Sequence, residues 1–381
     1  MHINELISQE FALQPDIIYL NHAAVAPWPQ RTKLAVQQFA AENAALGSKN
    51  YLQWVEHETD LRDMLAKLIN APSGDDVALL KSTSEALSVV AHGLRWQAGD
   101  NVVISDQEFP SNRIVWESLS SYGVEVKKVD LQSAETPEQA LIAACDSNTR
   151  LLAISSVQYA SGLRMDLDTL GKHCQSNHIL FCVDAIQSIG AVQFDVQACQ
   201  ADFVMADGHK WMLGPEGLAL FYCRAELRDQ LQLHQYGWHM VEHAHDFSRA
   251  DWQPAANAVR FECGSPNMLC GHALRASVSL LLEIGMDKVE QAVLSRTERI
   301  FELLQHSQNL QAITSNQTGR YAGIVTFAHK QADATDLYND LMSKGVMCAP
   351  RGGGIRYSPH FYTPLNKIES AIQLADNYPG S

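Results

Sequence analysis

Two short apolar runs in the middle of the chain end in polar residues that could together bind one small molecule. Residues 179–183 are followed by Asp184, with Gln187 three residues later, and residues 201–206 are followed by Asp207-Gly-His-Lys210. Both runs have the composition of buried strands. Because ligands of open α/β sheets bind at the carboxyl ends of the strands, a carboxylate and a lysine delivered there by neighbouring strands can converge on one ligand.

An aspartate and a lysine in this arrangement would suit pyridoxal phosphate. The lysine amine of such a site forms a Schiff base with the cofactor aldehyde, and an aspartate against the pyridine nitrogen keeps that nitrogen protonated, which makes the ring an electron sink. The spacing alone does not establish this chemistry, because an Asp and a Lys at two strand ends also form ordinary salt bridges or lie on a solvated rim.

The residues themselves resemble a known family. Asp184-Ala-Ile-Gln187, followed by Asp207-Gly-His-Lys-Trp-Met-Leu-Gly-Pro-Glu-Gly217, is similar to the class V aminotransferase family of fold-type I pyridoxal phosphate enzymes, which also includes cysteine desulfurases, kynureninases and isopenicillin N epimerases. The resemblance runs from Tyr19 to about Thr363. It implies an enzyme in which Lys210 holds the cofactor and then removes the Cα proton of an amino acid, while Asp184 faces the ring nitrogen.

Further cofactor contacts follow from the same resemblance. Gln187 would hydrogen-bond the ring oxygen, His209 would belong to the cofactor site, Phe109 would stack on the ring, and Gln158 would lie near the ring hydroxyl. Asp207 stands where desulfurases carry a phosphate-binding serine. Since a carboxylate repels a phosphate, we expect Asp207 to face a backbone N–H, an arginine or a partner group instead.

The phosphate is expected at the start of a helix. Ser82-Thr83-Ser84 follows a predicted strand, and free backbone N–H groups with hydroxyls at a helix start bind phosphate, although a simple helix cap explains the same residues. The resemblance places the phosphate on Thr83 and Ser84. It also implies that Ser265 reaches the phosphate of a neighbouring subunit, so that a homodimer would share its active sites.

Substrate contacts are implied at both ends of the chain. Asn21, His22 and Ala23 lie in a small-residue turn that crosses the mouth of the site in relatives, close to the substrate carboxylate. Arg356 matches the family arginine that grips the α-carboxylate, where a planar guanidinium gives a bidentate contact. An exposed strand arginine is the alternative explanation.

The shared residues leave the reaction open. A class V aminotransferase is the first expectation, and a lyase or epimerase of the C–S lyase, kynureninase or isopenicillin N epimerase kind is the alternative. Cysteine desulfuration is less favoured, because it needs a mobile thiol before the clamp arginine, and here that loop is the short Pro350-Arg-Gly-Gly-Gly354, with Cys348 in a predicted strand. An idle binding protein and a nicotinamide dehydrogenase are weaker alternatives, since the site residues are intact and GxGxxG is absent.

The fold class is predicted to be α/β, because apolar β-branched runs alternate with helical segments. The resemblance implies a fold-type I transferase with a large domain, built on a mostly parallel seven-stranded sheet, and a smaller α+β C-terminal domain. We expect an N-terminal segment at 1–15, the large domain at 16–258 and the small domain with its linking helix at 259–381. Residues 31–68 have helical periodicity.

Composition limits the partners and the compartment. The net charge of −15 argues against nucleic acid, and no apolar run approaches the length of a membrane span. The eight cysteines are scattered without a CxxC pair and the start resembles neither a signal nor a transit peptide, so we expect reduced thiols and a cytoplasmic location. His239 and His243 have i, i+4 spacing but no HExxH pattern, so no metal site is predicted.

Overall fold

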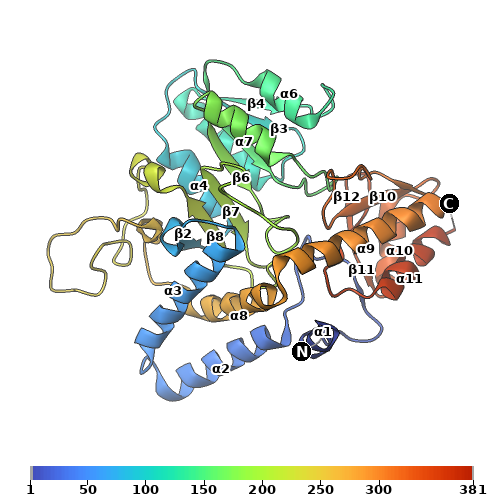
Figure 1. Ribbon diagram of the computed structural model, residues 1–381, viewed down its shortest axis with the longest axis horizontal. Helices are drawn as coiled ribbons and strands as arrows, with labels where there is room; N and C mark the ends of the chain where they lie inside the picture. Colours follow the sequence, from blue (N-terminus) through green and yellow to red (C-terminus); the bar gives the residue numbers. More distant parts are fainter. Residues whose placement is uncertain (1–2, 380–381) are drawn as a thin grey trace.

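A computed structural model describes residues 3–379, which form two connected parts (Figure 1). The larger part contains a seven-stranded sheet in the order β2-β8-β7-β6-β5-β3-β4. Its strands are β2 (Val77–Leu80), β3 (Asn101–Ser105), β4 (Glu125–Val129), β5 (Thr149–Ser155), β6 (Leu180–Asp184), β7 (Phe203–Asp207) and β8 (Ala219–Cys223). Strand β8 runs antiparallel to both of its neighbours and the other pairs are parallel, which confirms the predicted fold class.

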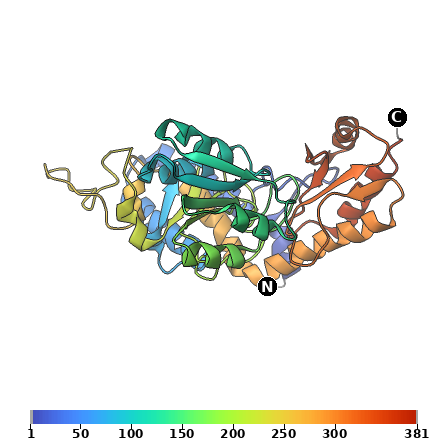
Figure 2. The same cartoon turned by 90° about the horizontal axis from the view of Figure 1, so that it is seen from above.

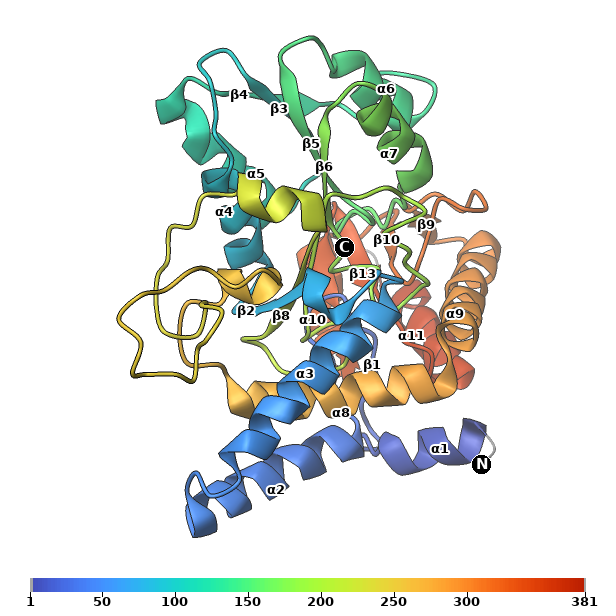
Figure 3. The same ribbon diagram turned by 60° about the vertical axis from the view of Figure 1, so that its left-hand side comes forward.

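Helices cover both faces of this sheet because successive strand residues point to opposite sides. Phe181 and Val183 of β6 pack into one apolar cluster, while Cys182 between them packs into another. The first cluster lies under α3 (Tyr51–Leu68), α6 (Pro137–Ala144), α7 (Leu167–Ser176) and α8 (Met268–Ile284), and the second lies under α4 (Thr83–Gly93) and α5 (Ser111–Glu117). Figure 3 shows α3 and α8 crossing the same end of the molecule as α2 (Gln30–Leu46).

The smaller part is a four-stranded antiparallel sheet with helices beside it. Its strand order is β12-β13-β10-β9, formed by β9 (Leu310–Ala312), β10 (Val325–His329), β12 (Ala349–Arg351) and β13 (Gly354–Tyr357). The long helix α9 (Met286–His306) leads into it, and α10 (Ala334–Ser343) and α11 (Leu365–Asp376) pack with it (Figure 2). Outside these sheets lie α1 (Ile3–Glu10) and short 3-10 helices at Gly74–Asp76, Ser118–Tyr122, Ala225–Gln230 and Ala258–Phe261.

Two segments pack differently from the expected division of the chain. Strand β1 (Ile18–Tyr19) lies in the predicted large domain, yet it pairs with β11 (Val346–Met347) and packs in the core of the smaller part. Helix α8 lies in the predicted small domain, yet its Leu274 and Val278 belong to the core of the large sheet. The chain therefore crosses between the two parts near both of its ends.

The predicted helical stretch of residues 31–68 is two helices. Gly47 caps α2 with φ of 58°, a left-handed conformation that ends the helix, and α3 begins at Tyr51. Among the described residues no single helix is long and apolar enough to span a membrane; α8 and α9 reach that length only as a pair bent by 86°.

Candidate active site

A cavity of about 280 Å³ opens at the carboxyl ends of the central strands, between the two parts of the molecule. Neighbouring strands deliver its polar groups, because Asp184 ends β6 and Asp207 ends β7, with Asp184 opposite Met205 in the register. Other lining residues come from the start of α4 and from the β12–β13 hairpin. The predicted residues that line this cavity are Ala23, Thr83, Ser84, Phe109, Asp184, Gln187, His209, Lys210 and Arg356, and Asp207, to which no cofactor contact was assigned, lines it as well.

Asp184 and Lys210 are both nearly buried, with exposed fractions of 2% and 9%. Burial raises the pKa of Asp184, although the backbone N–H of Ile186 donates to its Oδ1 at 3.1 Å and stabilises the charged form. Burial lowers the pKa of Lys210, and the charge of Asp184 acts in the opposite direction. A lysine with a lowered pKa is a better general base near neutral pH than an exposed one. Its Nζ lies 5.6 Å from the centroid of the Phe109 ring.

The start of α4 forms a polar end of the cavity. The Ser82 hydroxyl caps the helix by accepting from the backbone N–H of Glu85 at 3.2 Å, and Ser82, Thr83 and Ser84 all line the cavity. The Thr83 hydroxyl accepts from the backbone N–H of Asp207 at 3.0 Å, and the Ser84 hydroxyl donates to Ser111 at 2.8 Å. A helix N-terminus with hydroxyls beside it is a suitable phosphate site.

Several cavity groups lack hydrogen-bond partners within the described chain. Asp207 Oδ1 and His209 Nδ1 lie 2.8 Å apart but not in hydrogen-bonding geometry, and Arg356 Nε is also buried without a partner. Buried polar atoms normally find partners. Three such atoms around one cavity therefore fit a site that is completed by a polar ligand, and the hydroxyls at α4, the carboxylate of Asp184 and the amine of Lys210 fit pyridoxal phosphate.

The Arg356 side chain is held by neutral groups. Its Nη1 donates to Tyr159 O at 2.8 Å and its Nη2 to Asn21 Oδ1 at 3.4 Å, so Asn21 contacts the arginine without lining the cavity itself, and its predicted contact with the substrate stays a prediction. Burial, with a smaller effect from the charge of Arg351, lowers the pKa of Arg356 to about 10. The guanidinium is thus charged at neutral pH, and no acid of residues 3–379 forms an ion pair with it.

Other predicted residues lie elsewhere. His22 is fully buried beneath the cavity wall, where Nδ1 contacts Ser358 O at 2.8 Å and Nε2 contacts the Tyr362 hydroxyl at 2.7 Å. Gln158 also points away from the cavity, because its amide donates to Glu108 Oε1 at 2.9 Å and to Ser105. These two side chains are structural in the described chain and do not line the site.

Gln187 and Ser265, two further predicted residues, already have hydrogen-bond partners within the chain. Gln187 donates to Ala23 O at 3.1 Å and accepts from Trp211 Nε1 at 2.8 Å, so both ends of its amide are already bound. Ser265 is exposed outside the cavity of its own chain, where Trp238 Nε1 approaches its hydroxyl at 3.3 Å. Its predicted contact with a second subunit stays a prediction.

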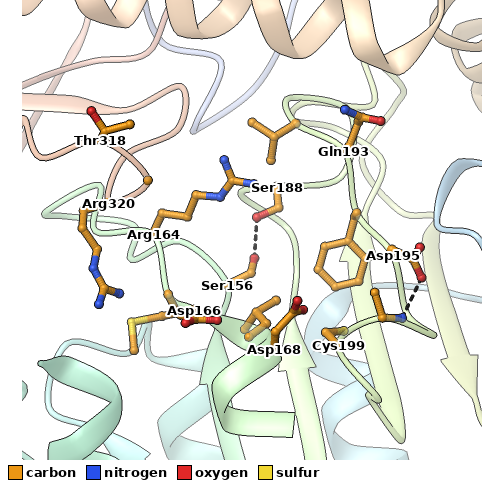
Figure 4. Close-up of a pocket in the computed structure, with 16 residues that line it drawn as sticks. Ser156, Arg164, Asp166, Asp168, Ser188, Gln193, Asp195, Cys199, Thr318 and Arg320 are labelled. Atoms are coloured by element: carbon orange, nitrogen blue, oxygen red, sulfur yellow. Dashed lines mark hydrogen bonds between the residues drawn. The ribbon is translucent and has the colours of Figure 1, made fainter. Parts of the chain in front are cut away.

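A larger cavity of about 610 Å³ lies behind the strand ends (Figure 4). Two buried serines of this cavity face one another, with Ser156 Oγ 2.6 Å from Ser188 Oγ. The backbone N–H of Ser156 donates to the carbonyl of Asp184 at 2.9 Å, and the Ser156 hydroxyl donates to the same carbonyl at 3.3 Å. This cavity contains neither Lys210 nor Arg356. Its hydroxyl pair therefore supports the backbone of Asp184 from behind rather than forming the reactive site.

The sequence did not single out some residues that line the cavity. Tyr159 directly follows Gln158, for which a cofactor contact was expected instead, and Arg351 lies in the short loop from Pro350 to Gly354, whose only noted feature was its lack of a thiol. The signal for Arg351 lies in the pairing register of the hairpin, which places it on the same face as Arg356.

Comparisons with known proteins agree with this geometry. The sequence model for "Aminotransferase class-V" matches residues 18–359. A probable cysteine desulfurase of Methanothermobacter thermautotrophicus is 29% identical, over 99% of this chain and 98% of that protein, and the uncharacterized aminotransferase YcbU of Bacillus subtilis is 31% identical, over 85% and 84%. The solved structure of the cystine C–S lyase C-DES has a TM-score of 0.87 at 19% identity, covering 96% of this chain and 99% of that one. On the extent of the family match, the chain belongs to the class V aminotransferase family of pyridoxal phosphate-dependent enzymes.

Proposed function

We propose that this protein is an aminotransferase that acts at the Cα atom of an α-amino acid. The observation that carries the proposal is the meeting of Lys210, Asp184 and Arg356 in one largely buried cavity. Pyridoxal phosphate, when bound, supplies a ring that accepts the electrons released at Cα. Thr83 and Ser84 would hold its phosphate, and Lys210 its aldehyde carbon.

The residues of the chain divide the remaining work among them. Arg356 binds the substrate carboxylate and so orients the amino acid in the cavity. The Lys210 amine, with its pKa lowered by burial, takes the proton from Cα and returns it to another atom. Asp184 would make a positive charge on the ring nitrogen favourable, because the Ile186 N–H fixes its carboxylate while Ser156, paired with Ser188, holds its backbone carbonyl.

The attachment residue can be tested directly. Borohydride reduction of the holoenzyme, followed by peptide mapping, is expected to label Lys210. Lys210→Ala is expected to remove the label and to reduce turnover by about 10² to 10⁴ fold, the usual contribution of a general base. Lys172→Ala, on the exposed side of α7, is the matched control and should keep both. A label on another residue, or none, would refute the proposal.

A C–S lyase is the second candidate, and the observation that favours it over a desulfurase is that no thiol of the described residues lines the cavity. Some relatives of this chain are named cysteine desulfurases. Cysteine desulfuration needs a cysteine thiol on the enzyme to accept the sulfur. Cys348 precedes the clamp arginine, but it is 2% exposed in the core of the smaller part, and burial raises its pKa to about 12. A lyase that releases its sulfur product into solution would need no such cysteine.

Product analysis separates the three reactions. Transamination requires a 2-oxo acid acceptor and yields a new amino acid, whereas a lyase releases ammonia and a 2-oxo acid without an acceptor. A desulfurase converts cysteine to alanine and leaves sulfur on the protein. Acceptor-dependent transfer is the result we expect, and protein-bound persulfide together with alanine would refute it.

We further propose a homodimer with shared active sites. The support is the position of Ser265, which is exposed outside the cavity of its own chain in a segment that resembles the phosphate-reaching segment of the family. Light scattering at decreasing concentration should give twice the chain mass. Ser265→Ala should weaken cofactor binding, and a fully active monomer would contradict the shared site.

A further inference from the structure

Arg351 and Arg356 occupy the same face of the β12–β13 hairpin. Ala349 pairs with Arg356 and Arg351 pairs with Gly354, and directly opposed residues of an antiparallel pair point to the same side. The two arginines are therefore diagonal neighbours, which lie roughly 7–8 Å apart in such a register, with their Cβ atoms somewhat closer. Both side chains reach the cavity that contains Lys210.

The turn between these strands fixes the geometry. Gly352 and Gly353 have φ of 57° and 79°, as a two-residue hairpin turn with two left-handed positions requires. A Cβ on Gly352 would lie 3.1 Å from Ala160 O, so the turn also packs closely against the segment that follows Tyr159. The hairpin thus holds Arg351 at the edge of the site on a short connection.

Neither arginine is neutralised by the part of the chain that the structure describes. No Asp or Glu oxygen there forms an ion pair with either one, whereas Arg62, Arg228 and Arg320 each pair with an acid. Among the described residues, the Nη1 of Arg351 donates only to Pro350 O at 2.9 Å. Two unpaired guanidinium groups on one face repel each other, and a ligand with two anionic groups would relieve that repulsion.

The acids of the cavity have other neighbours. Asp184 accepts from the Ile186 N–H, and Asp207 lies beside His209. The remaining cation, Lys210, is the attachment point of the cofactor in the proposed function. Of the two arginines that line the cavity, Arg356 binds the α-carboxylate in the proposed function, and Arg351 has no assigned ligand.

We propose that Arg351 and Arg356 form a pair that selects α-amino acids with a second anionic group, carboxylate or sulfinate, at the end of the side chain. Arg356 binds the α-carboxylate and Arg351 binds the distal group. The two carboxyl carbons of aspartate or glutamate lie roughly 4–5 Å apart, given C–C bonds of about 1.5 Å. Two arginine side chains that start from diagonal positions, roughly 7–8 Å apart, are long enough for each to contact one of these carboxylates. This inference rests on the proposed function and names its substrate class.

The test compares isosteric substrates on the holoenzyme. Wild-type protein is expected to prefer glutamate over glutamine and aspartate over asparagine in kcat/KM by about 10 to 100 fold, the range of a charged hydrogen-bonded pair. Arg351→Gln should reduce that ratio at least about tenfold, and Arg351→Lys should restore part of it, because the charge returns without the bidentate geometry. Arg95→Gln, at an exposed arginine outside the cavity, should keep the full ratio.

A binding measurement completes the test without turnover. Succinate, a dicarboxylate without an amino group, should bind the wild-type holoenzyme in calorimetry and bind Arg351→Gln at least about tenfold more weakly. Equal kcat/KM for glutamate and glutamine, or succinate binding that Arg351→Gln leaves unchanged, would overturn the inference. If the substrate inference fails in this way, a borohydride label on Lys210 would still support the proposed function. A protein without that label would refute the proposed function itself.

Discussion

The buried His22 makes the stability of this protein sensitive to acid. Its Nδ1 faces the carbonyl of Ser358, which can only accept, so Nδ1 carries the proton and Nε2 accepts from the Tyr362 hydroxyl. Burial lowers the pKa of His22 from 6.5 to about 4. At 1.36 kcal/mol for each pH unit, this difference between unfolded and folded protein corresponds to about 3 kcal/mol.

The sign follows from the lowered pKa. The contribution of neutral His22 is fully present above pH 6.5 and is lost as the pH falls from 6.5 towards 4, because the unfolded chain binds the proton first. His22→Asn cannot titrate, although it loses the Tyr362 contact and should be less stable by about 1–3 kcal/mol at pH 7.5. The gap between the two proteins should therefore shrink, or reverse, towards pH 4.

Urea unfolding followed by tryptophan fluorescence at several pH values measures this gap. Carboxylates titrate in both proteins, so the difference between the two curves isolates His22 to a good approximation. A gap that stays constant from pH 7.5 to pH 4.5 would refute the reasoning, since it would mean that His22 has the same pKa in the folded and the unfolded chain.

Three other changes test separate parts of the structure. Burial raises the pKa of Glu58 to about 7, so Glu58→Gln should stabilise the protein at pH 8 by up to about 3 kcal/mol in urea unfolding, and the gain should vanish below pH 4.5; an equal gain at both pH values would contradict this. Ser156→Ala and Ser188→Ala should each cost about 1 kcal/mol, and their double variant less than the sum, because the two hydroxyls bind each other; strict additivity in thermal melting would argue against a shared role. Gly353→Ala should cost about 1–2 kcal/mol through its positive φ alone, since no atom of the described residues outside its chain neighbours lies within 4 Å of the added Cβ; an unchanged melting temperature would show that the turn tolerates the residue.

The positions of the strands that end at Asp184 and Asp207 could be predicted from the sequence, because they depend on local composition. The apolar runs before Asp184 and Asp207 had to be buried, and their polar ends had to reach one edge of a parallel sheet. The break at Gly47 was missed, since apolar periodicity continues across it and only the left-handed φ of 58° ends the helix.

Side-chain direction at the ends of strands was less predictable. Gln158 and Tyr159 are adjacent, and the buried carboxylate of Glu108 decides between them, because it accepts hydrogen bonds from Gln158 and Ser155 and so draws the amide away from the cavity. Tyr159 is left to line the site. Glu108 lies some fifty residues earlier in the chain, so no local pattern could reveal this contact.

Arg351 shows how strongly substrate choice depends on pairing register. A shift of one residue in the β12–β13 hairpin would turn one arginine away from the other, because side chains alternate along a strand. The net charge of −15 has little influence at this position, since charges beyond about 8 Å are screened at physiological ionic strength. The nearby charges of Lys210, Arg351 and Arg356 therefore decide which anions enter, and the glycine turn that sets the register becomes part of the specificity of the site.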